Sequence, residues 1–207
     1  MVVETIPGVL AAAVAAWPVL VQFAAIVLVA DLAEYGIHRL FHRVPWLWPF
    51  HEVHHSSREM DWLAGSRIHL IEIVLTRSAV LMPLVVLGFS APAINGYVIL
   101  VGIQAVLAHA NLRINFGWLE YVLVTPRYHH WHHARHIDYI DVNYAIHLPV
   151  VDMLMGTFKR PPANVWPDEY GVMKLETVPT GIVAQTLMPL GPKKTFEDFV
   201  GKPEQAP

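Results

Sequence analysis

The sequence has no cysteine among its 207 residues. This absence excludes disulfides, thiolate metal sites, iron–sulfur clusters and a cysteine nucleophile. Charged residues are also scarce, at 15% of the chain, whereas soluble domains carry about 25%. With 55% hydrophobic residues, the composition indicates a membrane protein. The net charge of −3 argues against a nucleic-acid partner, because phosphate binding needs a basic surface.

Lysine and arginine are missing from residues 1–30 and from residues 78–112. Without a basic N-terminal stretch we expect no cleavable signal peptide. A membrane-crossing helix needs about 20 mostly apolar residues, and we predict spans at about 9–35, 70–89 and 93–110. Pro18 leaves two interpretations of the first span open: one kinked helix, or a short helix followed by a span. The uncharged stretch from Gly88 through Pro92 to Asn95-Gly96 predicts a tight turn between the second and third spans.

The positions of the basic residues predict the orientation. Five Lys and Arg residues lie between Arg39 and Arg77, and nine lie from Arg113 onward. The positive-inside rule places both zones in the cytoplasm, so we expect a multi-pass membrane protein with its site facing the cytoplasm. We expect the membrane to be a bacterial inner membrane. Residues 1–160 are predicted to form the membrane-embedded catalytic domain. Residues 161–207, which hold eight of the 16 prolines, are predicted to form a peripheral cytoplasmic tail.

Eight of the 13 histidines form three motifs: His38-x3-His42, His51-x2-His54-His55 and His129-x2-His132-His133. Neutral imidazole is the commonest metal ligand in proteins. On a helix the vicinal histidines of the second and third motifs point about 100° apart, so each member of a vicinal pair can serve a different ion. We therefore predict a dinuclear metal site with these eight residues as ligands. His109, at the end of the third span, is a candidate ninth ligand.

Several acidic and polar residues are expected beside the ligands. Asp31 and Glu34 lie in the apolar first span, where an ionisable group is costly and usually paired, and Asp31 shares a helix stripe with His38. We expect them to accept a hydrogen bond from the outer nitrogen of a ligand histidine, although they could instead mark the membrane boundary. Asp141 is a candidate for balancing the positive charge of the metals. His136, beside the third motif, is a candidate for supporting a ligand or handling protons.

These residues together resemble the fatty acid hydroxylase superfamily, also called the sterol desaturase family, of integral-membrane di-iron oxygenases. The resemblance is carried by the following segments: Asp31 to His42, Leu47 to Ser56, Met60-Asp-Trp62, Arg67-x-His69, His109-Ala-Asn111, Thr125 to His133, Asp141-Val-Asn-Tyr144 and Asp152 to Thr157. It implies an all-α fold, in which an integral-membrane helical bundle has a cytoplasmic helical cap that carries the dimetal site. The eight motif histidines and His109 then correspond to iron ligands. Asn143 and Asp152 correspond to positions beside the site, where we expect them either to hydrogen bond to ligands or to pack the cytoplasmic cap.

The resemblance also implies an activity. Two iron ions and O2 as co-substrate would oxidise a lipid C–H bond, by hydroxylation of a fatty-acyl, ether-lipid, sterol or isoprenoid substrate taken from the bilayer. The chain shows no dinucleotide-binding or haem-binding motif, so we expect an external electron donor: a reductase, a ferredoxin or a cytochrome b5-like protein. Desaturation by the same site is an alternative. A membrane metal-binding or transport protein is disfavoured, because the proposed ligands flank the spans on one face.

Overall fold

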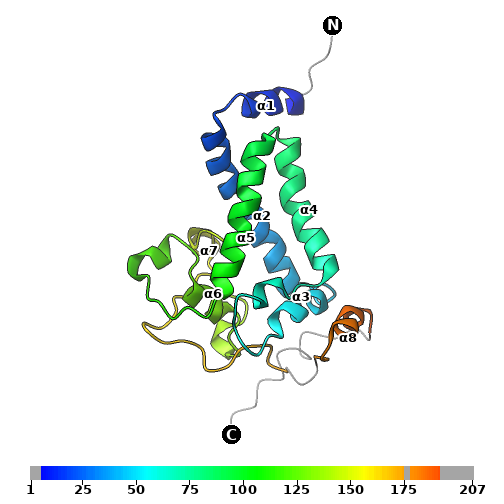
Figure 1. Ribbon diagram of the computed structural model, residues 1–207, viewed down its shortest axis with the longest axis vertical. Coiled ribbons are helices and arrows are strands. Elements are labelled where there is room, and N and C mark those ends of the chain that lie inside the picture. The colour runs from blue at the N-terminus through cyan, green and yellow to red at the C-terminus, as the bar shows by residue number, and fades with distance from the viewer. Residues whose placement is uncertain (1–5, 175–177, 192–207) are drawn as a thin grey trace.

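The computed structural model describes residues 6–174 and 178–191, and every regular element in that part of the chain is helical. One isolated bridge, between Ala134 and Tyr170, is the single β-type pairing found there. The predicted all-α fold is therefore confirmed. The longer helices are α1 (Ile6–Ala15), α2 (Val19–Arg43), α4 (Leu70–Val86) and α5 (Ala91–His109). Helices α2, α4 and α5 form an upright bundle, with α1 lying across its upper end (Figure 1).

The first predicted span is divided into two helices at Pro18. Proline has no N–H to donate and its fixed φ suits a helix start, so α1 ends at Ala15 and α2 begins at Val19. The buried Gln22 holds this junction: its Nε2 donates to the Trp17 carbonyl oxygen at 2.9 Å, and its Oε1 accepts from the Ser90 N–H at 2.7 Å. Of the two interpretations left open by the sequence, the structure has the short helix followed by the long one.

The turn between α4 and α5 is shorter than predicted. Gly88 has a φ of 82°, and a Cβ there would collide with the Ala11 backbone. Pro92 lies in the first turn of α5, where its missing N–H costs nothing. Asn95 and Gly96 consequently lie inside α5, and the prediction that they belong to the turn is wrong.

The bundle is apolar on its outside as well as in its core. Ile26, Leu84 and Tyr97 are fully buried between the helices. Large apolar side chains also cover the outward faces, among them Leu20, Leu28, Met82, Val85, Ile99 and Ile103. Helices α2 and α5 are long and apolar enough to cross a membrane, while α4, with 17 residues, is at the lower limit of about 17–25. An apolar exterior of this kind supports membrane association.

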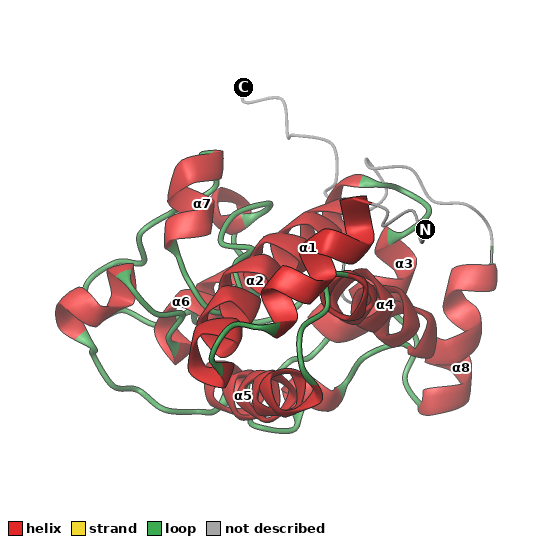
Figure 2. Ribbon diagram, turned by 90° about the horizontal axis from the view of Figure 1, so that it is seen from above, coloured by secondary structure: helices red, strands yellow, loops and turns green. Residues whose placement is uncertain are grey.

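Short helices form a cap at the lower end of the bundle (Figure 1). They are α3 (Trp48–His55), α6 (Pro126–His132), α7 (Val150–Met155) and α8 (Ile182–Leu187). Viewed from above, α6 and α7 lie on one side of the bundle, and α3 and α8 lie on the other (Figure 2). Part of the predicted tail belongs to this cap, because Val172 and Val178 pack against Trp48. Residues 175–177 and 192–207 of that tail lie outside the described residues.

Candidate metal centre

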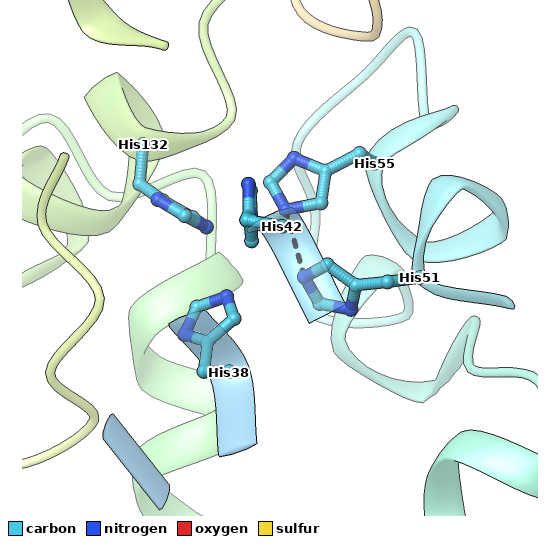
Figure 3. A group of neighbouring side chains, drawn as sticks. All are labelled: His38, His42, His51, His55 and His132. Atoms are coloured by element: carbon cyan, nitrogen blue, oxygen red, sulfur yellow. Dashed lines mark hydrogen bonds between the residues drawn. The ribbon is translucent and has the colours of Figure 1, made fainter. Parts of the chain in front are cut away.

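Two groups of histidines meet where the bundle joins the cap. The five-histidine group is made of His38, His42, His51, His55 and His132, and the four-histidine group of His54, His109, His129 and His133. Within each group the candidate ligand nitrogens all lie within 4.8 Å of one another. Figure 3 shows the rings of the five-histidine group converging on one point from α2, α3 and α6. All nine residues predicted as ligands are therefore brought together, and they divide five to four.

The vicinal histidines are divided between the two groups. His54 and His133 belong to the four-histidine group, whereas their neighbours His55 and His132 belong to the five-histidine group. Both pairs lie at the C-terminal ends of short helices, α3 and α6. The 100° step between successive helical residues turns the two rings of each pair to different sides. The predicted division of each vicinal pair between two ions agrees with this geometry.

Most of the rings direct Nε2 toward the centre of their group and use Nδ1 to hold their orientation. In the five-histidine group, the Nδ1 of His38 lies 2.8 Å from the Tyr144 carbonyl oxygen, and the Nδ1 of His132 lies 2.8 Å from that of Val142. In the four-histidine group, the Nδ1 of His109 lies 2.7 Å from the Ala105 carbonyl oxygen. A histidine that donates its Nδ1 proton outward presents the Nε2 lone pair inward, as a metal ligand must.

The loop of residues 141–148 orients three histidines of the five-histidine group. Besides the two carbonyl oxygens of Val142 and Tyr144, it supplies Asp141, whose Oδ1 lies 3.5 Å from the His42 Nδ1. Asp141 also pairs with Arg43 at 3.3 Å. The expectation that Asp141 lies next to the ligands therefore agrees with the structure. The backbone at Asp141 has a φ of 61°, in the left-handed region that costs a residue with a side chain about 1–3 kcal/mol.

Buried carboxylates fasten this loop to the rest of the chain. Asp31 accepts three hydrogen bonds, from the N–H groups of Ile146, His147 and Leu148, at 2.9–3.1 Å. Asp152 accepts from the N–H of Tyr144 at 2.9 Å and from that of Ala145 at 2.7 Å. The prediction that Asp31 accepts a proton from a ligand histidine is thus wrong, since both its oxygens bind backbone N–H groups. Asp31 and Asp152 act on the ligands indirectly, through the loop.

Asn143 has the same indirect role. Its side chain is fully buried, donates to the Lys159 carbonyl oxygen at 2.9 Å and accepts from the Lys159 N–H at 2.7 Å. It has a φ of 61°, a conformation that asparagine tolerates better than most residues. Of the two roles expected for Asn143, packing of the cap is the one found.

Glu72 was not among the site residues predicted from the sequence. Its Oε1 lies 2.6 Å from the His51 Nδ1, and both side chains are buried. A carboxylate bonded to the outer nitrogen of a ligand histidine fixes the ring and raises its basicity. The sequence held one signal for this role: Glu72 is a carboxylate in the first turn of an apolar helix, where an unpaired charge is costly.

Gly65 was also missed, and it makes room for His109. A Cβ at Gly65 would lie 2.9 Å from the His109 Nδ1 and 3.0 Å from the Ala105 carbonyl oxygen. The small residue lets the loop before α4 pack against the end of α5. His109 then reaches the His129 Nε2 at 2.9 Å and the His54 Nε2 at 3.3 Å.

Burial keeps these imidazoles neutral. It lowers the pKa of His54, His55, His129 and His133 well below the ordinary value, and neighbouring histidines add to the effect. Burial also lowers the pKa of His132, to about 3. The rings therefore offer lone pairs at neutral pH, which is the protonation state that metal binding needs.

The donor set fits two metal ions. The Nε2 atoms of His38, His42 and His132 are buried and have no hydrogen-bond partner in the described part of the chain. Leaving such groups unsatisfied costs about 1–3 kcal/mol each. Two nitrogens bound to one metal at about 2.1 Å lie roughly 3.0–3.4 Å apart, and the facing Nε2 atoms of His51 and His55 are 3.1 Å apart. Nitrogen donors without thiolate suit iron, copper, nickel or zinc.

The other histidines lie outside the two groups. His136 is half exposed and its Nδ1 accepts from the Asp138 N–H, so its predicted role beside the ligands is wrong. The Nδ1 of His69 accepts from the Ile71 N–H and caps α4. His130 bridges the Tyr170 hydroxyl and the Ala110 carbonyl oxygen.

Two cavities reach the histidines, one among the helices of the bundle and one within the cap. The membrane-side cavity, of about 120 Å³, lies between α2, α4 and α5 and is lined by histidines of both groups. The cap-side cavity, of about 70 Å³, is lined by His42, His55 and His132 of the five-histidine group alone. Glu34 lines the membrane-side cavity and pairs with Arg77 at 3.8 Å, so it faces the cavity instead of holding a ligand ring.

Comparisons with known proteins agree with this centre. The family model described as fatty acid hydroxylase matches residues 23–157, a range that includes all nine histidines. The chain is 30% identical to an ornithine lipid hydroxylase of Rhizobium tropici over 90% of its own length. It is 33% identical to the alkylglycerol monooxygenase of Homo sapiens over 62% of its length, and 27% identical to a very-long-chain aldehyde decarbonylase of Oryza sativa over 61%.

The relatives are longer than this chain. The match covers 55% of the ornithine lipid hydroxylase, 28% of the alkylglycerol monooxygenase and 21% of the aldehyde decarbonylase. No solved structure matches the chain.

Proposed function

Because this chain belongs to the fatty acid hydroxylase family, we propose that it is a membrane di-iron oxygenase that hydroxylates a C–H bond of a lipid. One observation carries the proposal: histidines of both groups line one cavity on the membrane side. A lipid chain in that cavity would lie against both metal sites at once.

The nine histidines would hold two iron ions, one in each group. Neither group offers six donors, so each ion would keep at least one position for O2 or water. When bound, the irons supply the redox chemistry that activates O2. Glu72, through His51, and Asp141, beside His42, would offset the positive charge of the ion in the five-histidine group.

In the overall reaction, one oxygen atom of O2 enters the lipid as a hydroxyl group. The other leaves as water, and two electrons and two protons are consumed. The electrons come from an external donor, since the chain shows no dinucleotide or haem motif. We assign the cap side to this donor, because the cap-side cavity reaches the five-histidine group and is lined by residues of the cap, among them Tyr139 and Met173.

For the topology, we propose that α2, α4 and α5 span the bilayer and that the cap faces the cytoplasm of a bacterium. The apolar outer surface of the bundle supports the spans. The absence of Lys and Arg from residues 78–112 supports the orientation, because basic residues are retained in the cytoplasm.

A single labelling experiment tests the function. The full chain is purified in detergent, loaded with iron, and incubated with a lipid extract, a chemical reductant and ¹⁸O2. We expect two irons per chain by metal analysis and one ¹⁸O in a lipid by mass spectrometry. A lipid that loses two hydrogens without gaining oxygen would show desaturation instead.

The control uses histidines inside and outside the groups. His129→Ala should lose activity and metal, whereas His136→Ala should retain both, because His136 is half exposed and lies outside the groups. A wild-type chain that binds fewer than two metals, or an active His129→Ala variant, would contradict the proposal.

A further inference from the structure

Helix α8 and the turn that follows it expose an apolar surface that the metal centre does not use. The sequence has no charged residue from position 181 to position 191. Ile182 alone is 82% exposed. Exposed apolar side chains gathered in one place mark sites of interaction with another molecule or with a membrane. Four such side chains form this surface, which we call the α8 patch: Ile182, Val183, Leu187 and Leu190.

The other side of this segment is attached to the cap. Met188, in the 3₁₀ turn η5 (Met188–Leu190), packs against the cluster of Val172 and Val178, and η5 contacts α3. Within α8, the Gln185 Nε2 donates to the Pro179 carbonyl oxygen at 2.9 Å. The segment therefore has one face held by the cap, while the α8 patch is left open.

His69 fixes α8 at the level where α4 begins. Its Nδ1 accepts from the Ile71 N–H, so the proton of the neutral ring is on Nε2. That Nε2 donates to the Thr186 carbonyl oxygen of α8 at 3.1 Å. Leu70, the first residue of α4, is exposed, as is Val74 one turn later on the same stripe. The α8 patch therefore adjoins the apolar outer surface of the bundle.

The direction of α8 suits the surface of a bilayer. Figure 1 shows α8 beside the lower end of α4, and in Figure 2 it extends across the view, whereas α5 is seen nearly end-on. Helix α8 thus lies roughly crosswise to the bundle. With six residues it is too short to cross a membrane, which takes about 20. A helix at the membrane surface lies in its plane, with its apolar face immersed by about 5–10 Å.

We propose that α8 lies in the bilayer surface on the cap side, with the α8 patch among the lipid acyl chains. Lipid is the occupant because the patch adjoins the surface that the bundle presents to the bilayer. The proposal rests on the proposed topology, in which the bundle spans the membrane. It gives the cap an anchor near the metal centre: Met188 and Trp48 pack on one apolar cluster, and the Trp48 ring centroid lies 5.1 Å from that of His42.

Depth measurements with single labels test the proposal. The chain has no cysteine, so Ile182→Cys and Leu187→Cys each accept one nitroxide label. The full labelled chain is placed in phosphatidylcholine nanodiscs. Electron paramagnetic resonance then compares collisions of the label with O2, which enters the bilayer, and with a water-soluble nickel chelate. Both labels should collide mainly with O2 and lie about 5–10 Å below the lipid phosphates.

Ile137→Cys is the matched control, because Ile137 is also an exposed isoleucine but lies in the turn with Tyr139, which lines the cap-side cavity. Its label should collide mainly with the nickel chelate. Leu28→Cys and Ile99→Cys report on α2 and α5, where the exposed side chains face the bilayer in the proposed topology; their labels should lie deeper than those on α8. Thermal unfolding checks the fold of each labelled variant, and Val183→Cys replaces an α8 variant that does not fold.

The outcomes separate the placement of α8 from the topology and the function. If the α2 and α5 labels lie in the bilayer but the α8 labels meet the nickel chelate as readily as the Ile137→Cys label does, the spans stand and this proposal is overturned. Spin–spin broadening between α8 labels would show a second copy of the chain on the patch and would also overturn it. If the α2 and α5 labels meet the chelate as well, the topology fails and the proposal with it. If the α8 labels lie in the bilayer but no lipid gains ¹⁸O, the placement of α8 stands and hydroxylation is wrong.

Discussion

Replacing Glu72 tests whether the two histidine groups are separate metal sites. The Glu72 carboxylate bonds to the His51 Nδ1 at 2.6 Å, and His51 belongs to the five-histidine group alone. Glu72→Gln keeps an oxygen acceptor but removes the charge, so the hydrogen bond changes from charge-assisted to neutral. The two classes differ by about 1–1.5 kcal/mol, which corresponds to about a 5- to 12-fold weaker affinity for one ion.

Glu72→Ala should cost more, because it also leaves the buried His51 Nδ1 without an acceptor. Loss of such an outer partner typically weakens metal affinity about 10- to 100-fold. The expected order of affinity at this site is therefore wild type, then Gln, then Ala, with the ion of the four-histidine group unaffected.

The assay is metal release against increasing chelator, with the metal per chain measured at each step. The wild-type chain should lose its ions with two affinities, and the Glu72 variants should shift one of them only. Glu59→Gln is the matched control, since Glu59 is exposed and belongs to neither group. Equal weakening of both ions, or no change in Glu72→Ala, would refute the reasoning.

Two further predictions concern stability. Burial lowers the pKa of His147 from 6.5 to about 4, so between these values the unfolded chain binds a proton that the folded chain does not. The contribution of His147 to the free energy of unfolding is complete above pH 6.5, and it decreases by up to about 1.4 kcal/mol for each pH unit below that value. Between pH 6.5 and 4, the melting temperature of His147→Gln should therefore fall by less than that of the wild-type chain. An equal fall in both proteins would contradict this prediction. Asp31→Asn should destabilise the chain by about 1–3 kcal/mol and weaken the five-histidine site, because the 141–148 loop loses its anchor; thermal unfolding and chelator titration check both effects, and unchanged values would contradict the anchoring role.

The histidine centre was predictable because its information is local. Spacings of three and four residues fix which rings share a helix face, and the 100° step assigns His54 and His55 to different groups. The stripe of Asp31, His38 and His42 is buried as the spacing predicts. Local rules suffice here, because each motif lies on one short stretch of helix.

The supporting contacts were not predictable, because they join residues that are distant in the sequence. His51 and Glu72 are 21 residues apart, and Asp31 lies 115–117 residues from the N–H groups that it binds. Nearness in the sequence was misleading for His136, since α6 ends at His132 and the chain then turns away from the site. The prediction of a turn at Asn95 and Gly96 failed because α5, with Pro92 in its first turn, has already begun before them.

The assignment of His54 and His55 to different ions can be tested by replacing each residue in turn. If His54 and His55 hold different ions, His54→Ala removes the ion of the four-histidine group and His55→Ala removes that of the five-histidine group, although the residues are adjacent. Each variant should retain membrane insertion and bind one ion per chain. Either loss should abolish lipid oxidation, because the proposed site needs both ions.

Combination with Glu72→Gln identifies which ion has been lost. Glu72 and His55 act on the same site, so Glu72→Gln should have little further effect on the ion that remains in His55→Ala. In His54→Ala, the remaining ion is the one that His51 holds, so Glu72→Gln should weaken it about 5- to 12-fold. If both combinations gave the same result, His54 and His55 would serve one ion, and the five-to-four division would be wrong.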